Sequence, residues 1–150
     1  MGYTFDNFVA HLQCPKCAAI SADDHMTLMK TGMRAKPSMA FLRVGDELFV
    51  DPAIMEQSGY LKVRDLADDR AVHILQTWSC PTCGTGMLWS EIVVEAGKIS
   101  SIVAVRLDAN ALARAHYIEC EAKEIAAELA GKDYTAVADA DVIEILRHAL

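Results

Sequence analysis

The pattern of apolar and polar positions is clearest in the middle of the chain. Three apolar segments rich in β-branched and aromatic residues follow one another there: 71–79 (AVHILQTWS), 87–95 (MLWSEIVVE) and 98–107 (KISSIVAVRL). The last two flank Ala96-Gly97, a dipeptide suited to a tight hairpin turn. The pattern therefore predicts a strand over 71–79, followed by a long antiparallel β-hairpin.

A helical period begins after this hairpin. Asp108 is a good N-cap residue and Gly131 a typical helix terminator, so we predict one helix between them. Apolar residues recur there every three or four positions. They are Leu112, Ala115, Ile118, Ala122, Ile125 and Leu129. A second helix is predicted from Asp139 or Asp141, because apolar residues again share one side. These are Val142, Ile145, Leu146 and Ala149.

The segment between residues 18 and 79 has a weaker pattern. Residues 38–44 and 47–50 contain alternating apolar positions and flank Gly45-Asp46. This arrangement predicts a second hairpin, and Asp51-Pro52 should end its second strand. The segment should therefore have structure of its own.

Composition narrows the class of protein. The chain has 150 residues, of which 53% are hydrophobic, so it can bury a core without disulfide bonds. No apolar run approaches the roughly 18 residues of a membrane span. The first residues also lack the basic and apolar regions of a signal peptide. We therefore expect a cytoplasmic protein with no membrane partner.

Net charge argues against one class of partner. The formal charge is -7, and most of the acidic excess lies in residues 108–150. Because nucleic-acid affinity comes largely from Lys and Arg at phosphates, this balance disfavours generic nucleic-acid binding. One basic cluster is present, and a solvated loop is its simplest interpretation. It consists of Lys30, Arg34 and Lys36.

Four of the five cysteines form two copies of the motif C-P-x-C. The first copy follows residues 8–13, whose alternation predicts a short strand, although a helical turn from Asp6 also fits. The second copy follows the predicted strand 71–79. Two such tight turns supply four thiolates, which fill the tetrahedral shell of a structural Zn²⁺. The predicted metal ligands are Cys14, Cys17, Cys80 and Cys83.

The same cysteines also fit other kinds of site. Iron in a rubredoxin-like site would use the same ligands, but Zn²⁺ is the metal we expect. A thiol–disulfide redox protein is the main alternative, because C-x-x-C at the start of a helix lowers a thiol pKa. The segment Gly84-Thr85-Gly86 and the β-rich residues after it oppose a helix there. Trp78 and Trp89 flank the second motif and should cover it.

No residue is assigned a catalytic role. The chain contains no G-x-S-x-G, no H-E-x-x-H and no glycine-rich phosphate loop. Cys120 and His116 lie four residues apart on the predicted helix, a spacing that some metal sites use, but nothing supplies further ligands. A buried structural cysteine is the interpretation we favour. His11 and His73 each precede a cysteine pair and are candidates for supporting or replacement ligands.

The two motifs and the hairpin after the second resemble zinc-ribbon proteins. The run from Cys80 to Thr85 (CPTCGT) stands before a strand and follows a cysteine knuckle and a long insertion. In this it is similar to the small gamma subunit of acetone carboxylase and its relatives near hydantoinase-type enzymes. The resemblance covers residues 10–110. It implies a subunit that serves a larger enzyme and carries no catalytic residue itself.

These patterns together predict an α+β fold. An antiparallel zinc-ribbon-like β domain spans 1–107 with an insertion at 18–79, which contains a β-hairpin. Two C-terminal helices in 108–150 pack on it, so that the chain forms a single domain.

The predicted function is that of a non-catalytic, structural-zinc accessory protein acting by protein–protein contact. It would be a small enzyme subunit, an adaptor or an immunity-type inhibitor. Two alternatives stay open: a thiol–disulfide redox protein that uses one C-P-x-C pair, and a transcription-associated zinc ribbon. The C-terminal helices also offer a surface for a homodimer.

Overall fold

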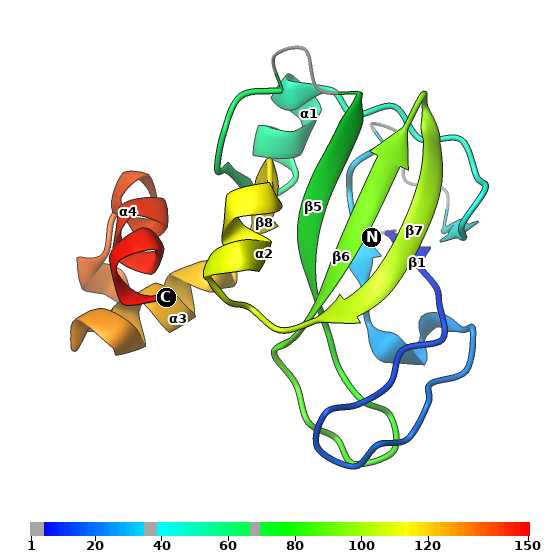
Figure 1. Ribbon diagram of the computed structural model, residues 1–150, viewed down its shortest axis with the longest axis horizontal. Coiled ribbons are helices and arrows are strands. Elements are labelled where there is room, and N and C mark those ends of the chain that lie inside the picture. Colours follow the sequence, from blue (N-terminus) through cyan, green and yellow to red (C-terminus); the bar gives the residue numbers. More distant parts are fainter. Residues whose placement is uncertain (1–4, 35–38, 67–69) are drawn as a thin grey trace, which may run out of the picture.

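The computed structural model describes residues 5–34, 39–66 and 70–150. Strands form two sheets in this part of the chain, and helices pack around them (Figure 1). The strands are β1 (Asp6–Phe8), β2 (Lys30–Thr31), β3 (Phe41–Leu42), β4 (Tyr60–Lys62), β5 (Ala71–Trp78), β6 (Leu88–Glu95), β7 (Lys98–Val105) and β8 (Tyr117–Glu119). The helices are α1 (Pro52–Gln57), α2 (Ala109–Arg114), α3 (Ala122–Ala130) and α4 (Asp139–Ala149), with single 3-10 turns at His25–Thr27 and Tyr134–Ala136. The predicted α+β class is confirmed.

The long strands β5, β6 and β7 form the centre of the larger sheet, whose order is β4-β8-β5-β6-β7. β6 pairs antiparallel with both neighbours, with a bulge between Val93 and Val94. The turn between β6 and β7 places Ala96 and Gly97 at φ of 51° and 75°. This is the left-handed conformation that a two-residue hairpin of type I′ requires. The predicted strand and hairpin are confirmed to within two residues at each end.

The predicted single helix from Asp108 to Gly131 is wrong, because a strand interrupts it. Asp108 does cap α2 by accepting from the Ala111 amide (2.8 Å), and Gly131 does end α3 with φ of 65°. Between these helices, β8 lies parallel to β5 and antiparallel to β4. Residues 115–118 are all exposed by 1% or less. A strand buried on both sides lacks the alternation that would distinguish it from a helix.

Residues 108–150 therefore contain three α-helices and a strand rather than two helices. The predicted start of the last helix near Asp139 is confirmed by α4. Val142 and Leu146 are buried on its inner side, where they pack with Ala126 of α3. Figure 1 shows α3 and α4 outside the sheet on the side of β8, away from β7.

The predicted hairpin over 38–50 is also wrong, and residue 38 lies outside the described part of the chain. β3 pairs in parallel with β1 instead of folding back on residues 47–50. Glu47 makes an isolated antiparallel bridge to Lys98, and the amides of Gly45 and Leu48 donate to carbonyls of the β6–β7 hairpin (2.7 and 2.8 Å). Edge strand β7 thereby gains backbone partners that a local hairpin would not supply.

The first strand lies earlier than predicted. β1 covers Asp6–Phe8 and not 8–13, and Gln13 makes only an isolated bridge to Ile20. The alternative of a helical turn from Asp6 is not observed. Asp51-Pro52 does not end a strand as predicted, because no strand covers 47–50. Asp51 instead caps α1 by accepting from the Ala53 amide (2.9 Å).

The larger sheet separates two hydrophobic cores. On one face, Ile74 packs with residues of the insertion such as Met29 and Met55. On the other face, Leu75 and Trp89 pack with α2, α3 and α4. Among the residues described, no helix is long and apolar enough to cross a membrane. The smaller sheet, of order β2-β1-β3, therefore lies on one side of the central layer, and helices α2, α3 and α4 lie on the other.

A buried polar chain links the smaller sheet to the larger one. The Tyr60 hydroxyl on β4 donates to Gln76 Oε1 on β5 and bonds to the Thr31 hydroxyl on β2 (2.9 Å). Gln76 Nε2 in turn donates to the Glu119 carboxylate on β8 (3.0 Å). Tyr60 is 4% exposed and Gln76 is 1% exposed. These bonds satisfy polar groups that would otherwise be buried without partners.

We expect Tyr60→Phe to lower the free energy of unfolding by about 1–3 kcal/mol, because it leaves the buried Gln76 carbonyl oxygen without its donor. Tyr134→Phe is the control, since Tyr134 is 47% exposed and should change stability by less than about 0.5 kcal/mol. Denaturant unfolding followed by circular dichroism measures both. Equal values for the two variants would contradict the role of the buried hydroxyl.

Candidate metal centre

Each C-P-x-C motif folds into the same backbone turn. In both, the amide four residues after the first cysteine donates to that cysteine's carbonyl, and the first cysteine's own amide donates to the carbonyl five residues on. All four bonds measure 2.9 Å. The left-handed position is Gly84 in the second turn (φ 78°) and Ala18 in the first (φ 63°). The first turn therefore forms without a glycine, although the left-handed conformation is unfavourable for a residue with a Cβ such as Ala18.

The two turns bring all four predicted ligands together. Cys14 Sγ lies 3.7 Å from Cys83 Sγ, Cys17 Sγ lies 3.7 Å from Cys80 Sγ, and the four sulfurs all lie within 4.8 Å of one another. Four sulfurs placed about 2.3 Å from one Zn²⁺ in a tetrahedron lie about 3.8 Å apart. A disulfide needs about 2.05 Å, and the cysteines are free thiols. The spacing therefore fits four-coordinate binding of a metal ion.

One thiol of each pair is buried and the other faces solvent. Cys14 and Cys80 are 1% and 3% exposed and belong to the core on the insertion side, whereas Cys17 and Cys83 are exposed. Trp78 belongs to the same core as the buried pair, and its indole Nε1 donates to a carbonyl of β6 (3.1 Å). Trp89 packs in the helix-side core. Both tryptophans are buried, so neither offers an exposed contact.

Hydrogen bonds within the turns set the proton affinity of the thiols. The hydroxyl and then the amide of Thr85 lower the pKa of Cys83 to about 6. The amide of Ala19 lowers the pKa of Cys17, but burial and the neighbouring thiols together outweigh it and raise this pKa to about 11. A metal that binds all four groups as thiolates must displace the proton of Cys17. Binding therefore releases protons and weakens as the pH falls.

The histidines near the cysteine pairs do not join this cluster. His11 Nδ1 lies 2.9 Å from the Ser21 carbonyl, to which it donates, and His73 Nδ1 lies 2.9 Å from the Glu91 carboxylate. In the described ranges, the four cysteines are the only group of three or more side chains placed to hold one metal ion. The predicted supporting role of His11 and His73 gains no contact from the structure.

Cys120 and His116 do not share a helix face, because β8 occupies this stretch. His116 is buried, and its Nδ1 accepts from the His73 amide (3.0 Å). Cys120 follows β8 with its Sγ packed over Gly59, where an added Cβ would lie 3.6 Å from the sulfur. Burial first, and then the charge of Glu119, raises the pKa of Cys120. His116 is therefore held in the core, whereas the Cys120 side chain is exposed, so the prediction of a buried Cys120 is wrong.

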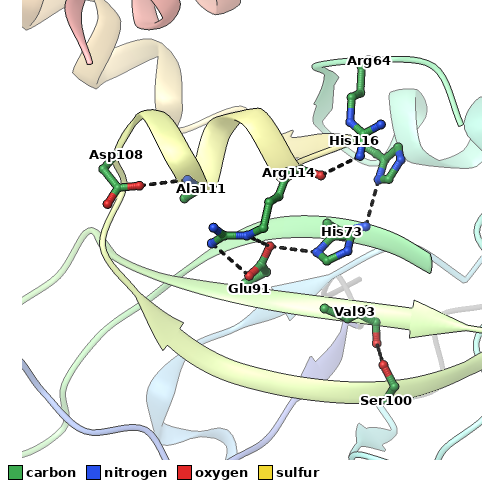
Figure 2. A network of polar contacts seen from close by, with 9 residues as sticks. All are labelled: Arg64, His73, Glu91, Val93, Ser100, Asp108, Ala111, Arg114 and His116. Atoms are coloured by element: carbon green, nitrogen blue, oxygen red, sulfur yellow. Dashed lines mark hydrogen bonds and ion pairs between the residues drawn. The ribbon is translucent and has the colours of Figure 1, made fainter. Parts of the chain in front are cut away.

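A second polar cluster lies on the helix side of the sheet (Figure 2). Glu91 on β6 accepts from His73 Nδ1 on β5 (2.9 Å) and from Nε and Nη2 of Arg114 on α2 (3.1 and 3.3 Å). Burial alone would raise the pKa of Glu91, but these two partners outweigh it and lower the pKa. The cluster ties α2 to the sheet. It was missed in the sequence because its members lie far apart and share no spacing.

The chain was compared with protein-family models, with curated proteins and with solved structures, and none of them matches it. The zinc-ribbon and acetone carboxylase resemblances thus rest on the cysteine motifs and on the strands that follow the second motif. What the structure supports is a cluster of four cysteines that can hold a metal ion.

Replacing Cys80 with Ser should abolish stoichiometric metal binding and lower the melting temperature by more than about 10 °C, because zinc binding in small modules amounts to about 10–16 kcal/mol. Elemental analysis and thermal unfolding measure the two effects. Cys120→Ser, outside the cluster, should keep one metal ion per chain. Unchanged metal content in Cys80→Ser would refute the ligand assignment.

The left-handed residue of the first turn gives a second prediction. Ala18→Gly should raise the free energy of unfolding by about 0.5–1 kcal/mol, because it relieves a strained φ. Gly84→Ala should lower it by about 1 kcal/mol, and no clash contributes, since a Cβ there meets nothing within 4 Å. Ala19→Gly, whose φ is not positive, should lower stability. Denaturant titration of the metal-loaded proteins ranks all three.

Proposed function

We propose that this chain binds one structural Zn²⁺ through Cys14, Cys17, Cys80 and Cys83 and acts as a non-catalytic accessory protein by contact with another protein. The observation that carries the metal is the arrangement of four thiols at the spacing of a tetrahedral shell. Four thiolates leave no coordination position for water or substrate. Such a site holds two distant segments together and has no open position at which to perform a reaction.

The accessory role rests on two further features. Large apolar side chains are exposed along the insertion, which is the composition of a contact surface. They are Ile20, Met26, Leu28, Met39, Phe41, Val44 and Phe49. The motif from Cys80 to Thr85 also resembles the gamma subunit of acetone carboxylase, a partner of a larger enzyme. A small enzyme subunit, an adaptor and an immunity-type inhibitor all fit this proposal.

Several finer points belong to the same proposal. We take residues 1–107 and 108–150 as one domain, because β8 of the second part pairs with β4 and β5 of the first. We place the protein in the cytoplasm, where reduced thiols persist. The homodimer through the C-terminal helices stays a prediction. A transcription-associated zinc ribbon has less support, because Arg34 is held by Asp6 (2.6 Å) and Lys36 lies outside the described residues.

A thiol–disulfide redox protein is the second candidate, and the lowered pKa of the exposed Cys83 favours it. Against it, neither cysteine pair opens a helix: each is followed by a hydrogen-bonded turn. The arrangement thus lacks the helix N-terminus that activates a thioredoxin-like thiol. Structural zinc explains both turns and all four sulfurs, whereas a redox pair explains two.

Alkylation of the native protein separates these candidates. At pH 8, iodoacetamide should modify one thiol per chain, Cys120, because a bound metal protects the other four. After removal of the metal with a chelator, mass spectrometry should find five modified thiols. Rapid modification of Cys83 in the protein as purified would favour the redox candidate. Elemental analysis of the same sample should give one zinc per chain, and one iron instead would contradict the choice of metal.

A further inference from the structure

Among the described residues, β4 is an edge of the larger sheet, and no strand pairs with its outer side. The Cys120 amide donates to the Gly59 carbonyl (2.9 Å), and the Val63 amide donates to the His116 carbonyl (2.8 Å). The backbone groups of residues 59, 61 and 63 therefore face β8. In an antiparallel pair the intervening residues point the other way. The amides and carbonyls of Tyr60 and Lys62 therefore face outward, and they have no hydrogen-bond partner in the described part of the chain.

A groove of about 460 Å³ runs along this edge, between β4 and α4. Four consecutive residues, Tyr60 to Val63, line it. Because side chains alternate between the faces of a strand, consecutive lining residues mean that the groove follows the backbone edge and not one face. Its opposite wall is one stripe of α4 that includes Ile143, which is 9% exposed. Figure 1 shows α4 standing outside the sheet on this side.

The charges of the groove favour a basic occupant. Three carboxylates line it, from Glu56, Asp139 and Glu144, against two cations. The Lys62 ammonium is held by Asp65 (2.8 Å), and Lys123 in turn pairs with Asp139 (3.1 Å), so that Glu56 and Glu144 are the two groove carboxylates with no Lys or Arg ion pair in the described part of the chain. Arg147 donates to the Val63 carbonyl (2.9 Å). The chain as a whole carries a formal charge of -7. A second copy of this acidic chain would therefore bring like charges together.

We propose that the β4–α4 groove binds an extended basic segment of another protein, which adds to the sheet as a strand beside β4. The outward amide and carbonyl of Lys62, which is exposed, supply the backbone hydrogen bonds. Apolar side chains of the segment pack on Leu61, Val63 and Ile143. The basic side chains that alternate with them point toward the carboxylates that line the groove. This proposal deepens the accessory role proposed above by naming a contact surface and the chemistry of its partner.

An acetylated octapeptide in which valine and lysine alternate is the probe. Titrated into the ¹⁵N-labelled chain as purified, it should cause saturable shifts in β4 and α4, and the matching valine–glutamate peptide should not. Peptides N-methylated at every second residue test the mode without altering the protein. One of the two N-methylated sets should lose at least fivefold in affinity, about one hydrogen bond, and the other should bind as the parent does.

Variants of Lys62 give a matched pair. Lys62→Pro removes the outward amide without breaking a bond to β8 and should weaken binding about fivefold or more. Lys62→Ala keeps the amide and should bind the peptide at least as well as the parent chain. Glu144→Gln should weaken binding of the valine–lysine peptide, because it removes a carboxylate that lines the groove. The melting temperature of each variant verifies its fold.

Three outcomes would overturn the proposal. They are the absence of saturable shifts, equal binding of both N-methylated sets, and self-association of the chain that Lys62→Pro removes, which would assign the edge to a second copy. Zinc content is measured on the same sample. A missing metal would therefore refute the structural-zinc proposal and would not bear on peptide binding. Absence of peptide binding would refute the groove proposal and would not bear on the metal.

Discussion

The meeting of two cysteine pairs that lie far apart in the sequence is the constraint on which this structure depends. The contacts join residues 63 and 69 positions apart, and closing a loop of that length costs about 4 kcal/mol in chain entropy. A structural zinc ion contributes about 10–16 kcal/mol in small modules, well above that cost. Four sulfurs in one place can therefore hold the insertion as a closed loop against the sheet, even though its strands before β5 have only two or three residues.

The cysteine cluster could be predicted from the sequence because its chemistry is local. C-P-x-C is a turn motif whose spacing aims both sulfurs the same way, and two copies complete one shell. The long hairpin around Ala96-Gly97 was likewise encoded in neighbouring residues. The conformation of Ala18 could not be predicted in this way, since the first turn adopts the left-handed conformation typical of glycine without a glycine. The same hydrogen bonds that close both turns hold it there.

The errors share a physical cause, which is that the partner of each segment lies far away in the sequence. Residues 115–118 have helical spacing, yet they are buried on both faces between β4 and β5, and full burial erases the alternation of a strand. Gly45-Asp46 has the composition of a hairpin turn, yet its neighbours bond to the β6–β7 hairpin. The cluster of His73, Glu91 and Arg114 could not be found at all, because only the folded sheet brings these residues together.

The insertion of β8 between β4 and β5 also bears on how the chain is made. The ribosome makes β5 before β8, so one edge of β5 is unpaired until residues 117–119 have been made. These residues follow Cys83 by some thirty positions. At about 5–20 residues per second this interval lasts about 2–7 s. All four thiols have been made by then. The four thiols can thus come together before the larger sheet is complete, while this edge of β5 is still unpaired.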